Sequence, residues 1–342
     1  MQDIQTIITL GYKSLASETL QHFDMISPDL RDQPREFAEW LATYRASLES
    51  LRETGDIKSL SNEGRDSLKA AIEILDMGIP APFKPHDPLS SISFALNIVQ
   101  LHLNIPSAEE LISKMGLKGS YKRADGNGGF VWSDEDGKLA QYFCPSFDPN
   151  RPALSAIGDV HEIIHALQTE TVELHRRFSQ RREVRRLLDL ESRLNSSGPL
   201  KNRLAAMVTK EHQLTYFLDP EVQEIARGMG VDMEHLDRYL KEHLPAFNFL
   251  YCFVEGDAFL KTVDMLRNPQ LVQRAPKQIN SYILMALTYA LLAPSSEPKP
   301  KVYEVGVGMV RHMRNNPGEQ ATLSSSREFH EELTRTYFQR AF

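Results

Sequence analysis

The feature that most constrains this chain is the segment His161-Glu162-Ile163-Ile164-His165, which brings two imidazoles and a carboxylate within five residues. Residues four apart lie on one face of an α-helix, so His161 and His165 can present ring nitrogens to a single metal ion. Glu162 points to the side of that face. Its carboxylate can reach a water molecule at an open position of the metal rather than the metal itself.

The residues around this motif are apolar, as a metal-bearing helix in the interior of a protein requires. They are Val160, Ile163, Ile164, Ala166 and Leu167. A solvated surface helix would carry polar side chains at several of these positions. The sequence therefore predicts a buried helix over about 157–178, with Zn²⁺ as the cofactor and His161 and His165 as two of its ligands.

A catalytic zinc site takes three protein ligands and leaves one position open. We expect Glu255 to be the third ligand, because it lies in a mostly apolar stretch, 253–260, where a carboxylate is costly to bury unless it is paired or metal-bound. Gly256 beside it leaves room for this helix, predicted over about 247–266, to pack closely against the helix of the histidines. The alternative is that Glu255 and Asp257 only stabilise the start of a surface helix.

The two motifs together resemble the glutamate-zincin metallopeptidases, a thermolysin-like group in which His-Glu-x-x-His on one helix is completed by a glutamate on a later helix. The resemblance is carried by His-Glu-Ile-Ile-His-Ala-Leu-Gln, which ends at Gln168, and by Val-Glu-Gly-Asp-Ala at 254–258. It implies a zincin-like catalytic domain and a zinc peptidase that hydrolyses a peptide or protein substrate. Glu162 would then be the general base.

Tyr303 and His330 are candidates for stabilising the oxyanion of that reaction. In the family that the chain resembles, a Tyr-x-x-Gly segment and a later histidine follow the glutamate helix, and Tyr303, Gly306 and His330 match them in order. A tyrosine hydroxyl or a histidine can donate a hydrogen bond to such an oxygen. His312 and Tyr282 could do the same, and an ordinary packed or surface role stays open for each of these side chains.

The chain departs from the family one turn after Glu255, where Phe259 stands in place of an acidic residue that orients a zinc-bound histidine. A metal-bound histidine usually donates its second ring nitrogen to an acceptor. Asp257 or Asp264 could be that acceptor, and the sequence does not choose between them.

Composition sets wider limits. With 41% hydrophobic and 25% charged residues, 342 residues can bury a substantial core. No apolar stretch reaches the ~20 residues that a bilayer span requires, and the N-terminus shows no secretory signal, so we expect a cytoplasmic protein without a membrane partner. The net charge of −7 argues against general nucleic-acid binding. The arginines between 176 and 186 fit a solvated helix or a site for an acidic peptide or an anionic surface.

Hydrophobic periodicity predicts a mainly α-helical protein with a small antiparallel β-sheet, which is an α+β class. The β signal is a hairpin at about 128–143, where an acidic turn separates two β-prone runs. Proline-rich stretches at 80–88 and 294–300 suggest the boundaries. The expected parts are an N-terminal helical region at 1–85, a zincin-like core at 86–293 and a helical segment at 301–342 that packs on the core.

Two other functions fit the same residues. The first is a helical oxygenase that holds iron through histidine and glutamate, or haem through a histidine, with Glu211, His212 and His243 as further donors. The second is a non-catalytic binding protein that keeps a metal for stability. In that case Glu162→Gln would change neither the metal content nor the biological activity, because only catalysis needs the base.

Overall fold

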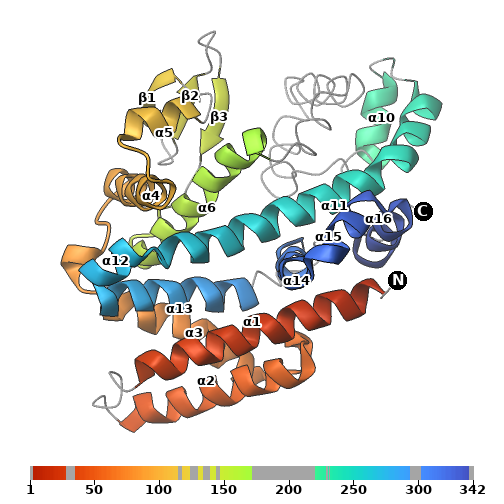
Figure 1. Ribbon diagram of the computed structural model, residues 1–342. Helices are drawn as coiled ribbons and strands as arrows, with labels where there is room; N and C mark the ends of the chain where they lie inside the picture. Colours follow the sequence, from red (N-terminus) through yellow and green to blue (C-terminus); the bar gives the residue numbers. More distant parts are fainter. Residues whose placement is uncertain are drawn as a thin grey trace.

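The long helix α11 (Met233–Leu266) crosses the middle of the molecule and packs against helices on both of its sides (Figure 1). On one side lies α6 (Pro152–Thr171), itself covered by α4 (Pro88–Leu103), and on the other lie α13 (Pro276–Leu292) and α14 (Val302–Asn315). Asp232 caps the first turn of α11, because its carboxylate accepts from the backbone N–H of His235 at 3.1 Å. α11 is therefore the helix on which α6, α13 and α14 all pack.

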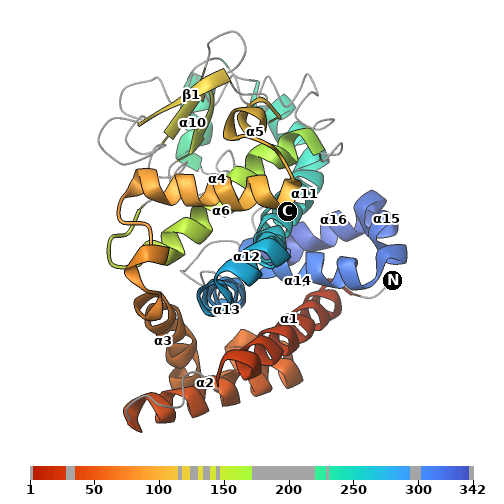
Figure 2. The same cartoon turned by 60° about the vertical axis from the view of Figure 1, so that its left-hand side comes forward.

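The N-terminal helices continue this packing. α1 (Ile4–Ile26) lies on α14 and α13, and α2 (Arg35–Thr54) packs on α1 (Figure 2). α3 (Asn62–Gly78) packs on α2 and α13 and reaches the start of α6, where Asp76 accepts from the backbone N–H of Leu154 at 2.9 Å. One cluster of buried apolar side chains runs through all of these helices. The division of the chain near residues 85 and 293 stays a prediction.

Shorter elements complete the computed structural model. They are the 3-10 turns Ile57–Ser59 and Ala81–Phe83, α5 (Ala108–Lys114), β1 (Lys118–Arg123), β2 (Phe130–Ser133), β3 (Leu139–Phe143), α10 (Pro220–Gly228), α12 (Pro269–Arg274), α15 (Pro317–Ser325), α16 (Arg327–Leu333) and a π-helical turn at Thr334–Phe338. The structure describes residues 3–27, 35–114, 118–123, 130–133, 139–143, 147–171, 220–228, 230, 232–292 and 302–338. The arginines between 176 and 186 lie outside these ranges.

The expected α+β class is wrong, because the core is all-α. Its buried side chains come from helices packed on helices and from the short connections between them, and no sheet forms a layer of it in the part of the chain that the structure describes. The predicted hairpin itself is confirmed, since β2 pairs with β3 in antiparallel register, and β1 adds a third strand. Strands this short make a small meander rather than a wall on which helices could pack.

α14 is held between α11 and α1 by glycines at the helix crossings. A Cβ added at Gly306 would lie 2.1 Å from the carbonyl oxygen of Cys252 on α11, and one at Gly256 would lie 2.1 Å from that of Gly306. Further along α14, a Cβ added at Gly11 of α1 would lie 1.6 Å from the carbonyl oxygen of Gly308. Gly256 was expected to admit the histidine helix; instead it admits α14.

Both helices predicted to carry the metal ligands are present. α6 begins at Pro152, earlier than the expected 157, and residues 172–178 at its predicted end lie beyond the described part. α11 contains the predicted range 247–266 and extends it by several turns toward the N-terminus. No described helix is long and apolar enough to cross a membrane.

Candidate metal centre

The contact between α6 and α11 brings His161, His165 and Glu255 together. The Nε2 atoms of His161 and His165 lie 2.9 Å apart, and they lie 3.2 Å and 3.3 Å from Oε2 of Glu255. The side chains are largely inaccessible, with exposed fractions of 8% for His161, 17% for His165 and 10% for Glu255. A group of buried side chains that could hold a metal ion is thus formed by residues 94 positions apart in the chain.

The donor set and its spacing fit a zinc ion. Zinc binds imidazole nitrogen and carboxylate oxygen at about 2.0–2.2 Å, so two ligand atoms at the tetrahedral angle lie about 3.3 Å apart. The three distances between ligand atoms, 2.9, 3.2 and 3.3 Å, approach that value. Three protein donors also leave one position for water or substrate, as catalytic zinc sites do.

The electrostatics of the group favour a cation. Burial acts to raise the pKa of Glu255, but the imidazoles of His165 and His161 outweigh it and hold this pKa well below its usual range. Burial likewise acts to lower the pKa of His165, and the charge of Glu255, to which it is hydrogen-bonded, raises this pKa to about 9. Without a metal ion, the buried carboxylate is thus balanced by positive charge on His165, and a bound metal ion would take over that role.

Gln168 orients His165. The amide nitrogen of Gln168 donates to the carbonyl oxygen of Val254 at 3.1 Å and to Oδ2 of Asp257 at 2.7 Å, so its oxygen is the atom that faces Nδ1 of His165, at 3.0 Å. Nδ1 must then carry the proton, because it is the donor in this contact. The other nitrogen, Nε2, faces Glu255 and His161, so it is the atom that can bind a metal ion once it has released its own proton.

Asp257 anchors this link from α11. Its carboxylate also accepts from Nη2 of Arg314 at 2.9 Å and pairs with Nζ of Lys261 at 2.8 Å. Burial acts to raise the pKa of Asp257, but these cations and the Gln168 amide outweigh it and lower that pKa. The sequence offered Asp257 or Asp264 as the direct acceptor for a histidine. The structure shows Asp257 acting through Gln168, while Asp264 binds Arg314 at 2.8 Å.

His161 is positioned by packing. Its ring lies against Phe259 with the centroids 4.4 Å apart, and Tyr303 lies on the same side at 6.4 Å. Its Nδ1 is buried and has no hydrogen-bond partner within the described ranges. Phe259, which replaces the acidic residue of the family pattern, therefore supports the first histidine by contact.

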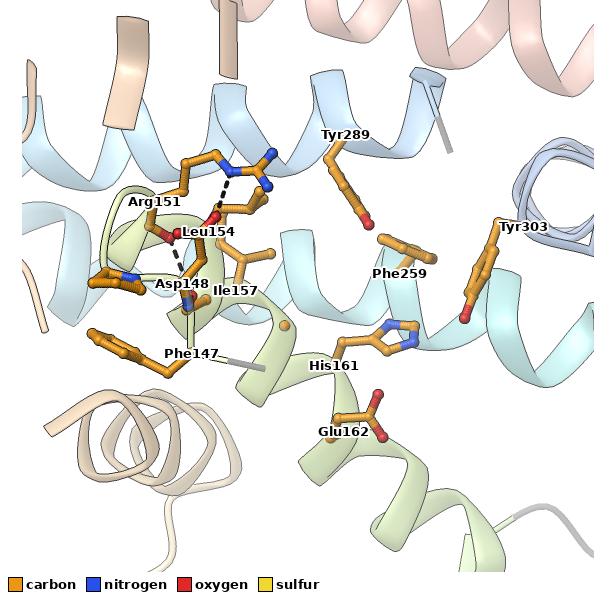
Figure 3. A pocket seen from close by; sticks show the side chains of 13 residues that line it. Phe147, Asp148, Arg151, Leu154, Ile157, His161, Glu162, Phe259, Tyr289 and Tyr303 are labelled. Atoms are coloured by element: carbon orange, nitrogen blue, oxygen red, sulfur yellow. Dashed lines mark hydrogen bonds and ion pairs between the residues drawn. The ribbon is translucent and has the colours of Figure 1, made fainter. Parts of the chain in front are cut away.

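A cavity of about 640 Å³ opens next to His161, and Figure 3 shows Glu162 and Tyr303 on either side of that histidine at one end of it. Glu162 follows His161 on α6, is half-buried, and is not a member of the ligand group. Much of the remaining wall is apolar or aromatic. The sequence prediction for Glu162 is thus matched in position: it lies beside the ligands and faces the cavity.

Of the four candidate oxyanion donors, the structure brings Tyr303 to the site. Burial and the charges of Glu255 and Glu162 raise the pKa of Tyr303 far above its usual range, so its hydroxyl keeps the proton and can donate it in a hydrogen bond. Tyr282 instead donates to the carbonyl oxygen of Phe83 at 2.8 Å.

His330 and His312, the remaining candidate donors, lie elsewhere in the structure and have other contacts. His330, a candidate oxyanion donor from the sequence, stacks on Phe249 with ring centroids 4.1 Å apart, and its Nε2–H donates to the carbonyl oxygen of Leu323 at 3.2 Å. His312 pairs with Glu319 at 3.1 Å. Neither belongs to the ligand group or to the cavity beside it in the described part of the chain. The order of residues in a motif did not indicate this distance in space.

We assigned no role to Gln168 from the sequence, although this side chain orients His165. It stood in the motif that carried the resemblance, and its spacing of three from His165 places both on one helix face, so this link was available from the sequence.

No family model, no curated protein and no solved structure matches this chain. Its family is therefore not identified, and the metal centre rests on its own geometry.

Proposed function

We propose that this protein is a zinc-dependent hydrolase that cleaves peptide bonds. The observation that carries the proposal is the convergence of His161, His165 and Glu255 with a separate carboxylate, Glu162, at the end of a cavity of substrate size. A metal held for stability alone needs its ligands. It does not need a free carboxylate beside them and an open space in front.

Bound zinc would supply a Lewis acid and a water molecule whose pKa is lowered to near neutrality. Hydrolysis joins the oxygen of water to the carbonyl carbon, breaks the C–N bond and transfers a proton to the leaving nitrogen. Glu162 can take the proton from the water and pass it to that nitrogen. Tyr303 can donate a hydrogen bond to the carbonyl oxygen as negative charge develops on it. Gln168 and Phe259 keep the two histidines in place.

A second candidate is an iron-dependent oxygenase, because two histidines and one carboxylate also suit ferrous iron. The further donors that an oxygenase would use cannot be placed, because Glu211 and His212 lie outside the described residues, as does the side chain of His243. Glu162 favours hydrolysis over oxygen chemistry, since a general base beside the metal is what hydrolysis requires.

The experiment is metal analysis together with a peptidase assay on four proteins without a polyhistidine tag: wild type, His165→Ala, Glu255→Ala and Glu162→Gln. We expect about one zinc per wild-type chain, little zinc in the two ligand variants, and zinc without turnover in Glu162→Gln. Iron in the wild type, with oxygen consumption, would favour the oxygenase. Zinc with full activity in Glu162→Gln would contradict the role of the base.

A further inference from the structure

The cavity beside the metal centre has a charged group at its far end. Arg151 lies just before α6, on the same side of the helix as the cavity, and Figure 3 shows it at the opposite end of the view from His161 and Glu162. The two ends are ten positions apart in the sequence, which corresponds to about 15 Å along a helix. The space is therefore elongated, with the metal ligands at one end and a guanidinium at the other.

Arg151 is held in place by local structure. Its Nε–H donates to Oδ2 of Asp148 at 2.9 Å, while Oδ1 of Asp148 accepts from the backbone N–H of Asn150 at 2.9 Å. The backbone N–H of Asp148 in turn donates to Oγ of Ser155, also at 2.9 Å, which fixes this turn to the first turn of α6. The guanidinium is thus bound through one edge by the turn that presents it.

The other edge of Arg151 is available to a ligand. A guanidinium has five N–H donors, of which the contact with Asp148 uses one. The side chain keeps 46% of its surface exposed, and the Asp148 side chain keeps 31%. The two terminal amino groups of a guanidinium form a planar fork that matches the two oxygens of a carboxylate. The remaining donors therefore suit a carboxylate in the cavity.

An aromatic wall joins the two ends. The rings of Tyr289 and Phe259 lie 5.7 Å apart, those of Phe259 and Tyr303 lie 5.4 Å apart, and Phe259 packs on His161. Burial raises the pKa of Tyr289 and the positive charge of Arg151 acts against that rise, so Arg151 acts on the near end of this wall. A ligand along the wall would contact Arg151 at one end and the metal ligands at the other.

We propose that Arg151 binds a carboxylate on the substrate, and that the part of the substrate between this carboxylate and the reacting bond is apolar and lies along Tyr289, Phe259 and Tyr303. At about 3.3–3.6 Å per residue, about four extended residues would cover the ~15 Å between the two backbone positions. The carboxylate is that of a peptide C-terminus or of an acidic side chain at the corresponding position. This inference rests on the proposed peptidase function for the identity of the substrate, but the binding site itself does not depend on turnover.

The test is a binding measurement on the zinc-loaded Glu162→Gln variant, which cannot consume its ligand. The probes are three N-terminally labelled octapeptides with one apolar sequence: a free acid, its C-terminal amide, and an amide with glutamate as the last residue. We expect the free acid to bind 10- to 100-fold more tightly than the plain amide, because a charge-assisted, bidentate contact is lost in the amide. Binding of the glutamate peptide tells whether a side-chain carboxylate serves equally well.

The same measurements in Glu162→Gln combined with Arg151→Gln should abolish the preference for the free acid, and Arg151→Lys should keep part of it. Arg274→Gln is the matched control, because Arg274 lies exposed on α12 and not at the cavity. Equal affinity for all three peptides, a preference for a carboxylate that survives Arg151→Gln, or no binding of any probe would overturn the inference. A preference that depends on Arg151, without cleavage by the wild type, would instead contradict the peptidase proposal alone.

Discussion

The side-chain oxygen of Gln168 lies 3.0 Å from Nδ1 of His165, one helical turn away on α6, while the amide nitrogen of the same Gln168 reaches Asp257 on α11. One amide thus connects a histidine of the metal group to a carboxylate on the helix that carries Glu255. The connection makes Nδ1 of His165 a donor and leaves Nε2 as the nitrogen that can bind a metal ion. It also ties the relative position of the two helices to the geometry of the group.

Replacing Gln168 should therefore weaken metal binding without removing a ligand. Gln168→Met keeps the size of the side chain but removes the acceptor for Nδ1, and we expect zinc affinity to fall 10- to 100-fold, as for other partners of metal-bound histidines. Competition with a chromogenic chelator measures the change. Gln270→Met, at an exposed position of α12, is the control. Unchanged affinity in Gln168→Met would mean that packing alone orients His165.

Replacing Tyr303 should lower kcat, whereas replacing His330 should not. Tyr303→Phe removes the hydroxyl and keeps the ring contact with Phe259, so we expect kcat to fall about 10- to 100-fold while KM changes little. His330→Gln should leave both constants within about twofold, because His330 lies against Phe249 and Leu323 rather than at the cavity. Steady-state kinetics on one peptide substrate separates the two. A large loss of kcat in His330→Gln with wild-type kinetics in Tyr303→Phe would reverse the assignment.

The metal group could be predicted because its evidence is local. A spacing of four fixes His161 and His165 on one helix face, and a carboxylate in an apolar stretch such as Glu255 needs a partner to be buried. The partners of Asp257 could not be predicted, since Arg314 is 57 positions away and only the crossing of α14 and α11 brings it near. The location of His330 on Phe249 could not be predicted for the same reason, because a shared order of residues carries no information on distance.

The fold class was missed for a related reason. A hairpin near residue 130 is a clear local signal, and it was correct, but it does not tell whether the sheet forms a layer of the core. That depends on how the helices pack on one another, which the hairpin signal does not contain. Gly306 and Gly256 let α14 and α11 approach so closely that helix packs on helix. From the sequence, Gly256 was assigned to the wrong neighbour, because a small residue predicts a close approach but not its partner.

This crossing should be intolerant of a single methyl group. Gly306→Ala would place a Cβ 2.1 Å from the carbonyl oxygen of Cys252, and backbone on both helices would have to shift. We expect a loss of about 2 kcal/mol or more in the free energy of unfolding, measured by urea denaturation. Gly318→Ala is the matched control, because nothing lies within 4 Å of its added Cβ. In that variant alanine should be neutral or stabilising by up to about 1 kcal/mol. Similar stability of the two variants would contradict the close packing.

His330 should make the stability of the protein depend on pH. Burial lowers the pKa of His330 to about 4, although donation to the carbonyl of Leu323 acts in the opposite direction, and in the unfolded chain a histidine has a pKa of about 6.5. Above pH ~6.5 both states are neutral, and the group has no effect on the pH dependence. As the pH falls from about 6.5 to about 4, the unfolded state binds a proton that the folded state excludes, so the folded state loses stability, by about 3 kcal/mol in total.

His330→Gln removes this titration while it keeps a hydrogen-bond donor for Leu323, and it can be compared with the wild type by urea unfolding at pH 8, 6.5, 5 and 4. At pH 8 the wild type should be the more stable by about 1 kcal/mol, because glutamine loses the stacking on Phe249. Toward pH 4 the difference should shrink and then reverse. The metal centre titrates in both proteins and cancels in the comparison. A difference that stays constant across this range would show that His330 is protonated in the folded protein as readily as in the unfolded chain, and that its burial against Phe249 is incomplete.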